Sequence, residues 1–516
     1  MLPRLLQMEV TSTLQLPSFH IIGLPSPEVA EAKDRVRSAI LASGLKFPKR
    51  RVLLNLSPAS IRKQGTGLDL AMALSVLSAS LKTQPPKIMA WGELGLNGSV
   101  KPCGQLTRVL YACWKAQIKT LLLSSLEFED GVKRLKLLKE GHPSLGNSIQ
   151  LIPVENLAEA WEAFRQPENQ VEIIRKNSSY AVNSEAKQNF TQKSHSLLLP
   201  LRPSLERILG VSAAGNHHIF LVGPRGTGKS HALDWLIELQ PEMNSEQRVT
   251  QSLLQEINTP FELNEKLPVR RIGIQTRPTA LTGTITNFGI KPGEFSMAHG
   301  GLLIADELPE WDRDAREALR EPLERGTVTL TRSRMSVEFP AKFLLAASGN
   351  FCPCGGWPPE IQSFPSSLGN DGDNPACVCV PHRRRDYMNK ISGPLLDRID
   401  IAVQLTQSAA TDKPIVSKMR FDALKTKVAQ TRMILVERWG KPAGRLLPTD
   451  LEELLSTHPK WTQWLDSFPD CTLRGRHKLL RVALTFAAWD QAAEVSVQHF
   501  KEAALYRAQF KAWHVS

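Results

Sequence analysis

Long apolar segments are missing from this chain of 516 residues. No run of about 18 apolar residues occurs, so the sequence contains no segment typical of a transmembrane helix. The N-terminus lacks the succession of basic, apolar and small residues that marks a secretory signal. We therefore expect a cytoplasmic protein without a membrane partner.

Cysteine and aromatic residues are both scarce. The seven cysteines are an odd number, and four of them form two tight pairs, which argues against a disulfide framework. Aromatic residues make up 6% of the chain and form no obvious series on which bases could stack. No internal repeat is visible, so the chain is not a repeat array.

Positive charge, by contrast, is in excess. The chain has 64 Lys and Arg residues against 51 Asp and Glu residues, a formal net charge of +13. This balance favours a polyanionic partner, most simply nucleic acid. A basic protein without such a partner explains the charge equally well.

A glycine-rich stretch follows an apolar strand-like run and precedes a helical pattern. Residues His217–Val222 form the apolar run, and Gly223–Ser230 has the spacing G-x-x-x-x-G-K-S of a phosphate-binding P-loop. Lys229 supplies a positive charge for the β- and γ-phosphates of ATP, and the Ser230 hydroxyl is placed to bind Mg²⁺. The three glycines that let backbone N–H groups converge on an anion are Gly223, Gly226 and Gly228.

A second apolar run ends in two carboxylates. Residues Gly301–Glu307 read as a buried strand followed by Asp306 and Glu307, which is a Walker B pattern downstream of the P-loop. Asp306 would hold Mg²⁺, and Glu307 would orient the water that attacks the phosphate. Surface acids that cap a helix are the alternative.

Two further polar residues are candidates for the same site. Asn350 follows the apolar run Phe343–Ala347, where an amide could sense the γ-phosphate, although an isolated asparagine is more often a turn residue. Arg398 lies between Asp397 and Asp400, and from these residues alone a local salt bridge is the better interpretation.

Two closely spaced cysteine pairs flank a loop rich in glycine, proline and asparagine. The pairs are Cys352 with Cys354 and Cys377 with Cys379, so the loop spans residues 352–379. Four thiolates brought together in this way suit tetrahedral Zn²⁺, which would keep the loop ordered. Four reduced structural thiols are the alternative.

The chain is too long for one hydrophobic core, and its pattern changes along the sequence. Near the N-terminus, strand-like runs such as Phe19–Ile22 alternate with helical patterns such as Ser26–Ser43, which favours an α+β domain. Near the C-terminus, helical patterns such as Ile415–Trp439 dominate. We expect an α+β domain over 1–165, a polar linker over 166–196, a P-loop ATPase core over 197–407 and a helical domain over 408–516.

Several blocks distributed over nearly the whole chain resemble the magnesium-chelatase-like AAA+ proteins and, among them, the ComM/YifB competence-protein family. The downstream blocks are Pro292-Gly293-Glu294, Asp306-Glu307-Leu308-Pro309-Glu310, Ala318–Glu324, Cys352-Pro353-Cys354-Gly355 and Ile391–Asp400. The upstream blocks are Gly23-Leu24-Pro25, Asn55–Ala59, Gly67–Leu70 and Gly92–Gly98.

This resemblance implies a multidomain α/β fold with a Lon-protease-like α+β domain, an AAA+ P-loop ATPase domain and a helical C-terminal lid. It also implies a homo-oligomeric ring, commonly a hexamer, with ATP between subunits. By position, Arg398 becomes the arginine finger that reaches a neighbour's γ-phosphate, Asn350 becomes sensor 1, and Arg474 becomes the sensor-2 arginine that contacts nucleotide in its own subunit.

The sequence departs from the family pattern at several places. One extra residue, Ser348 or Gly349, stands between the paired alanines and Asn350. In the N-terminal domain, the serine and lysine positions of a Lon-type protease fall near Gly67 and Thr107, so neither catalytic residue is present. We expect a degenerate protease-like domain.

The family resemblance implies an ATP-dependent motor that promotes branch migration of DNA during recombination in natural transformation. The alternation Val328–Phe339 reads as a hairpin with Arg332 and Arg334 at its tip, and in the family this hairpin points into the ring pore with the insertion around Thr276–Lys291. Such arginines could grip the phosphate backbone of branched or single-stranded DNA. An ATP-driven protein remodeller and a DNA-binding platform with a weakened ATPase are the alternatives.

Overall fold

The computed structural model divides into two compact units. One contains Met1–Phe190 and Asn244–Glu265, and the other contains Thr191–Met243 and Lys266–Ser516. The structure describes residues 3, 5–58, 63, 65–79, 86–143, 149–166, 201–257, 267–286, 289–332, 335–358, 376–406, 418–468 and 472–508. All of the expected linker except residue 166 lies outside these residues.

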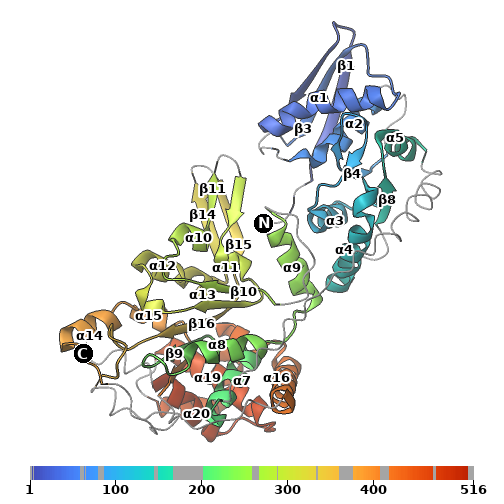
Figure 1. Ribbon diagram of the computed structural model, residues 1–516. Coiled ribbons are helices and arrows are strands. Elements are labelled where there is room, and N and C mark those ends of the chain that lie inside the picture. The colour runs from blue at the N-terminus through green and yellow to red at the C-terminus, as the bar shows by residue number, and fades with distance from the viewer. Residues whose placement is uncertain are drawn as a thin grey trace. The chain divides into compact units, whose positions relative to one another are not determined.

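The first unit contains two three-stranded sheets with helices packed on them (Figure 1). In the order β1-β3-β2, β1 is antiparallel and β2 parallel to β3, whereas β4-β7-β8 is parallel throughout. Strands β5 and β6 of this unit form a short antiparallel pair. Their bounds are β1 Gln7–Thr13, β2 Ser18–Ile22, β3 Arg51–Ser57, β4 Met89–Trp91, β5 Glu93–Leu94, β6 Val100–Lys101, β7 Thr120–Ser124 and β8 Gln150–Val154.

The first predicted helix is confirmed as α1 (Pro27–Ala42). Ser26 caps it by accepting a hydrogen bond from the Val29 N–H, and Pro27 starts the first turn, where no intrahelical donor is needed. Buried residues at helical spacing, including Val36 and Ile40, attach it to the core. The other helices of this unit are α2 Asp69–Ser78, α3 Leu106–Lys115, α4 Phe128–Gly141, α5 Leu157–Arg165 and α9 Ser245–Gln255.

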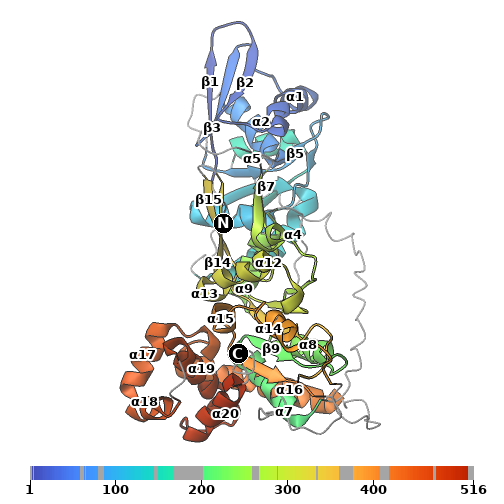
Figure 2. The ribbon, with the colours of Figure 1, turned by 90° about the vertical axis from the view of Figure 1, so that its left-hand side faces the viewer.

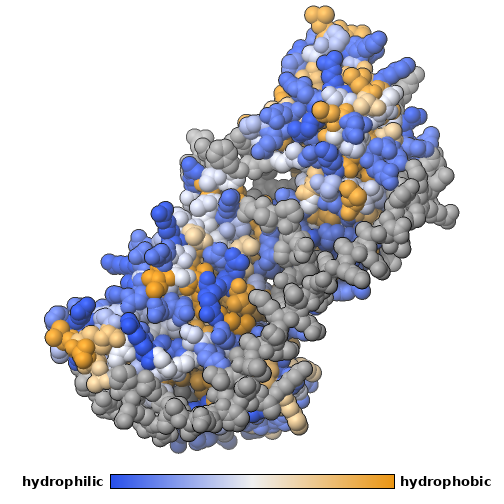
Figure 3. Space-filling view, viewed as in Figure 1, coloured by the Kyte–Doolittle hydropathy of each residue, from blue (hydrophilic) through white to orange (hydrophobic). Residues whose placement is uncertain are grey.

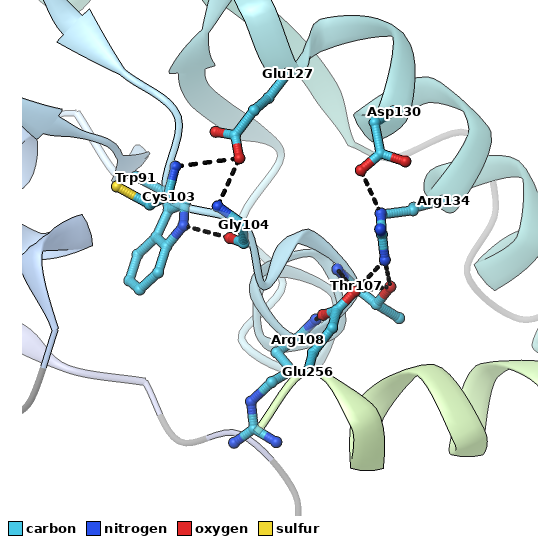
Figure 4. Close-up of polar contacts among 9 residues, drawn as sticks. All are labelled: Trp91, Cys103, Gly104, Thr107, Arg108, Glu127, Asp130, Arg134 and Glu256. Carbon is cyan, nitrogen blue, oxygen red and sulfur yellow. Dashed lines mark hydrogen bonds and ion pairs between the residues drawn. The ribbon is translucent and has the colours of Figure 1, made fainter. Parts of the chain in front are cut away.

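Helix α9 lies in the sequence between α8 and β10 of the second unit but belongs to the first unit. Val249 and Leu253 of α9 share a buried cluster with residues of α3 and α4. Just after the helix, Glu256 accepts hydrogen bonds from Thr107 Oγ1 at 2.8 Å and from the Arg108 N–H at 3.1 Å (Figure 4). Its carboxylate also pairs with the buried guanidinium of Arg134. A segment expected within the range 197–407 is therefore part of the N-terminal core.

The second unit is built on a five-stranded parallel sheet in the order β10-β13-β16-β9-β17. Four of its strands are buried along their whole length, as their continuous apolar runs predict. Alternate residues face two different cores, so that Ile219 and Leu221 of β9 join one cluster and Phe220 and Val222 join the other. The bounds are β9 Ile219–Val222, β10 Val269–Ile272, β13 Leu302–Ala305, β16 Leu344–Gly349 and β17 Ile401–Gln404.

Helices cover both faces of this sheet. The face that includes Ile219 packs on α7 (Pro203–Gly215), α8 (Lys229–Glu238) and the C-terminal helices, and Figure 2 shows α17, α18 and α19 gathered in one helical group. The other face packs on α10 Pro278–Thr282, α11 Glu294–Met297, α12 Arg313–Ala318 and α15 Gly393–Leu396. The C-terminal helices are α16 Lys418–Trp439, α17 Pro448–Thr457, α18 Pro459–Asp466, α19 Leu473–Trp489 and α20 Val497–Ala508.

Two hairpins and two further helices complete the second unit. The hairpins are β11 (Gly283–Thr286) with β12 (Gly289–Pro292) and β14 (Thr327–Arg332) with β15 (Met335–Pro340). The helices are α13 (Arg320–Arg325) and α14 (Pro381–Met388).

The observed architecture is a mixed α/β protein with a parallel sheet and a helical C-terminal region, as predicted. Among the described residues, no helix is both long and apolar enough to cross a membrane.

Candidate functional site

Three strands of the parallel sheet deliver the predicted site residues to one edge. Strand β9 runs into the P-loop, β13 into Asp306 and Glu307, and β16 into Asn350. Because neighbouring strands are parallel and in register, their carboxyl ends meet at the same edge, where α/β sheets usually bind ligands.

The P-loop backbone has the conformation of an anion nest. Gly226 and Gly228 have positive φ angles of 79° and 83°, which side chains rarely tolerate. At Gly223, a Cβ atom would lie 2.4 Å from the carbonyl oxygen of Leu405, so only glycine fits without a backbone shift. Helix α8 starts at Lys229, which places its N-terminal end beside the loop.

Lys229 is the centre of the polar contacts at this edge. Its Nζ donates to the carbonyl oxygens of Gly223 at 2.8 Å and Pro224 at 2.7 Å, and to Asn350 Oδ1 at 3.0 Å. Burial lowers the pKa of Lys229 to about 8, and the charges of Glu307 and Asp306 partly oppose this shift. An anionic phosphate would favour the charged lysine further, so the site suits the ligand that the P-loop predicts. Asn350, the predicted sensor, is buried against the lysine.

The Asp306 carboxylate and the Glu307 backbone are connected by Ser348, which no sequence motif predicts as a site residue. Ser348 Oγ donates a hydrogen bond to Asp306 Oδ1 and accepts one from the Glu307 N–H at 2.9 Å. The Trp311 indole also donates to the Asp306 carbonyl oxygen at 3.1 Å. Register alone could have revealed this contact, because Ala347 pairs with Ala305 and the next residues therefore lie opposite each other.

The Ser230 hydroxyl and the Asp306 carboxylate fit the hard oxygen ligands that Mg²⁺ prefers. Ser230 is exposed in the first turn of α8, and Asp306 is half-buried at the end of β13. These two residues could hold the metal that accompanies a nucleotide.

Arg398 and Arg474 come together on one carboxylate, Glu324 of α13. Arg398 Nη2 pairs with Glu324 Oε2, and Arg474 Nη2 lies 2.8 Å from Glu324 Oε1. Both guanidinium groups lower the pKa of Glu324, with Arg398 the larger cause. The sequence analysis missed Glu324 as a site residue, since no local pattern connects it with arginines 74 and 150 positions away.

Arg398 also lies at the opposite edge of the sheet from its own P-loop. It precedes β17, whose first residue pairs with Ile219, the first residue of β9. The P-loop follows the last residue of β9. Arg474, expected near the nucleotide of its own subunit, instead shares Glu324 with Arg398, and its contact with nucleotide stays a prediction.

A buried charged cluster joins this amino edge to the helical region. Asp400 accepts from Lys478 Nζ of α19 and from the His218 N–H, both at 2.9 Å. Burial lowers the pKa of Lys478 to about 8, whereas Lys478 and two histidines lower the pKa of Asp400 despite its burial. The cluster fixes α19, which carries Arg474 in its first turn, against the strand that leads into the P-loop.

The four predicted cysteines are brought together. The Sγ atoms of Cys352, Cys354, Cys377 and Cys379 all lie within 4.8 Å of one another. The N–H groups of Gly356 and Cys379 donate to two of these sulfurs, both at 3.4 Å, as is usual around metal thiolates.

The cysteine cluster is attached to the P-loop and has an apolar exterior. The carbonyl oxygen of Gly355, beside Cys354, accepts from the Arg225 N–H of the P-loop at 3.0 Å. Val378 and Val380 alternate with the cysteines and are exposed, and Figure 3 shows apolar atoms at the α14 end of this unit.

The predicted basic hairpin is confirmed as β14 and β15, but only one of its two arginines can be placed. Arg332 is exposed and donates from Nη1 to the carbonyl oxygen of Ile285 at 2.5 Å, so the hairpin contacts the β11–β12 hairpin. Arg334 lies outside the described residues.

The two positions that would hold the catalytic serine and lysine of a protease have structural contacts instead. A Cβ atom at Gly67 would lie 2.5 Å from the Trp91 ring, so the space of a serine side chain is occupied. Thr107 is fully buried and bonded to Glu256.

Comparisons with known proteins match three parts of the chain. Residues 202–413 match the family model for magnesium chelatase, subunit ChlI, residues 8–126 match that for subunit ChlI of Mg-chelatase, and residues 420–507 match that for the ChlI C-terminal region. A parallel sheet with a P-loop at its carboxyl edge, together with these matches, defines the class as a magnesium-chelatase-like protein with an AAA+ type of fold.

Within this class, some relatives cover almost the whole chain. The YifB protein of Escherichia coli is 28% identical over 510 residues, covering 97% of this chain and 94% of the relative. Competence protein ComM of Haemophilus influenzae is 28% identical over 525 residues, covering 98% and 95%. Magnesium-chelatase subunit ChlI of Chlorella vulgaris is 29% identical over 155 residues, covering 26% and 44%. The chain belongs to the ComM/YifB type of magnesium-chelatase-like proteins.

Proposed function

We propose that this protein is an ATPase whose active site is completed between subunits of a homo-oligomeric ring, and that it uses ATP to move on DNA. One observation carries the proposal. Lys229, Asp306 and Asn350 meet at the carboxyl edge of the sheet. Arg398 lies at the opposite, amino edge, away from the P-loop of its own subunit. A second subunit that presents Arg398 to this P-loop would complete the site.

When bound, ATP would supply the phosphoryl group, and Mg²⁺ would supply positive charge that neutralises the phosphates. The P-loop N–H groups and Lys229 bind the phosphates, and Ser230 and Asp306 hold the metal. Glu307 orients the attacking water. Asn350, which accepts a hydrogen bond from Lys229, contacts the γ-phosphate. The neighbour's Arg398 stabilises the charge that develops during transfer.

The position of Arg474 supports a role beside Arg398. Both arginines bind the two oxygens of Glu324, so a neighbour's γ-phosphate would compete with that carboxylate for the pair. We assign Arg474 to the neighbour's nucleotide rather than to that of its own subunit.

Three observations favour DNA as the partner of the ring. The net charge is +13, the exposed Arg332 lies near the tip of a hairpin that contacts a second hairpin, and a relative of nearly full length is a competence protein. Branch migration of recombining DNA during natural transformation is the reaction that fits these features. The hairpins would contact the phosphate backbone without reading bases.

We further propose that the four cysteines bind Zn²⁺ and that the N-terminal unit is a protease-like fold without protease activity. Four sulfurs within 4.8 Å suit a closed tetrahedral zinc site that holds the loop beside the P-loop. Metal analysis of the purified protein should give one zinc per chain, and Cys377→Ser with Cys379→Ser should remove it.

The test of function is an ATPase assay with and without branched DNA. Stimulation by DNA and branch migration in the wild-type protein, both lost in Lys229→Ala and Glu307→Gln, would support the motor. ATP hydrolysis without any DNA binding at low salt would instead favour a protein remodeller. The similarity to a magnesium-chelatase subunit is consistent with that alternative. DNA binding without hydrolysis would favour a DNA-binding platform.

A further inference from the structure

We propose that Ser348 is a positioning residue for ATP hydrolysis, which uses one hydroxyl to set both the metal-binding carboxylate Asp306 and the backbone of the water-orienting Glu307. The proposal rests on the ATPase function proposed above. It assigns a role to the strand residue that lies two positions before Asn350, within the segment where the sequence departs from the family pattern.

The hydroxyl of Ser348 donates to one of these residues and accepts from the other. Its proton goes to Asp306 Oδ1, and its oxygen accepts the Glu307 N–H at 2.9 Å. Ser348 is 1% exposed, and its strand is paired on both sides, with β13 and with β9. The hydroxyl is therefore held by the sheet, so the two residues that it contacts are positioned from a rigid element.

Glu307 needs such support because its backbone is strained. Its φ and ψ angles are 49° and 46°, the left-handed conformation that is unfavourable for a residue with a side chain. Strain of this kind persists where the surrounding contacts determine the conformation. The hydrogen bond from the Glu307 N–H to Ser348 helps to fix this turn, together with the bond that the Glu310 N–H donates to the Glu307 carbonyl oxygen at 2.8 Å. The turn sets the direction in which the Glu307 side chain leaves the strand.

The second half of the contact acts on Asp306. The proton that Oδ1 accepts from Ser348 holds the carboxylate, and with it the oxygens that would bind a metal, in one orientation. A rotation of the carboxylate would break the bond to Ser348. The same hydroxyl thus couples the orientation of the metal ligand to that of the residue that orients water.

The test compares Ser348→Ala, Ser348→Thr and the matched control Ser296→Ala in the full-length protein. Ser296 is also a buried serine of the ATPase unit, but its hydroxyl has no hydrogen-bond partner among the described residues. We expect Ser348→Ala to lower kcat about 10- to 100-fold, as misplacement of reacting groups does. ADP affinity and the melting temperature should stay near the wild-type values, and the Mg²⁺ concentration for half-maximal activity should rise. Ser296→Ala should behave as wild type.

Two results separate positioning from simple packing. Ser348→Thr, which keeps the hydroxyl, should recover most of kcat, and it should return the Mg²⁺ concentration for half-maximal activity to near the wild-type value. A Ser348→Ala variant with kcat within two-fold of wild type, or a threonine variant no better than alanine, would overturn the proposal. Wild-type protein that does not hydrolyse ATP would instead overturn the proposed function.

Discussion

His218 shows how burial makes a single residue sensitive to pH. The ring Nδ1 of His218 accepts the Leu345 N–H at 3.0 Å, so the folded state requires the neutral ring. The backbone N–H of His218 donates to Asp400. Burial lowers the pKa of His218 to about 3. In the unfolded chain the ring has a pKa of about 6.5, so below that pH the unfolded state binds a proton that the folded state does not. The free energy of unfolding should therefore fall as the pH is lowered from about 6.5 toward 3.

His218→Asn tests this reasoning, because an asparagine oxygen can accept the same N–H without titrating. In chemical denaturation between pH 5 and 6, the free energy of unfolding of the second unit should fall less steeply with decreasing pH in the variant than in wild type. The difference in slope should be about 1.4 kcal/mol per pH unit, the value for one proton. His217, whose burial lowers its pKa to about 4, should leave part of the dependence in place. An exposed histidine, His382, gives the control His382→Asn, which should keep the wild-type slope. Equal slopes in all three proteins would contradict the assignment.

At the scale of elements, the attachment of α9 to the N-terminal unit depends on a buried charged contact. The side chains of Glu256 and Arg134 are 0% and 4% exposed, and Thr107 and the Arg108 N–H complete the site (Figure 4). Glu256→Gln would leave the Arg134 charge without its buried carboxylate, although Asp130 still pairs with it at 2.6 Å. We expect the free energy of unfolding of this unit to fall by about 3 kcal/mol, the lower end for a broken buried pair.

Urea denaturation and amide hydrogen exchange measure this effect. Glu140→Gln is the matched control, because Glu140 of α4 also contacts α9, through Ser245 at 3.5 Å, but is exposed. It should change stability by less than about 0.5 kcal/mol. Faster exchange confined to α9 in Glu256→Gln is expected; unchanged exchange there would show that apolar packing alone holds the helix.

The sequence predicts those elements whose signals are local. Continuous apolar runs predict β9, β13 and β16, and because parallel strands end at one edge, the meeting of Lys229, Asp306 and Asn350 follows from the motifs. The sequence does not predict that α9 packs in the N-terminal unit, since the partners of Glu256 lie 122 and 149 residues away. Ser348 and Glu324 were missed for a similar reason: their roles come from register and tertiary contact, which no motif records.

At the scale of the whole molecule, the parallel sheet separates the parts of the catalytic site proposed above. The residues proposed to bind nucleotide follow the strands, and Arg398 precedes β17. Its position beside Glu324 and Arg474 makes this edge a cationic face that a neighbouring P-loop could meet. Hydrolysis should then require two subunits, each supplying a different half.

Mixing variants tests this division directly. Arg398→Ala should bind ATP but lose about 10³-fold in kcat, as loss of an arginine finger does, and Glu307→Gln should also be inactive. In an equimolar mixture of the two, some interfaces combine an intact Glu307 from one subunit with an intact Arg398 from the next, so ATPase activity should rise well above the sum of the separate proteins. Lys229→Ala mixed with Glu307→Gln gives no such interface, because both residues belong to the same half, and should stay inactive. If Arg398 acted within its own subunit, both mixtures would be equally inactive, and the ring model of the site would fail.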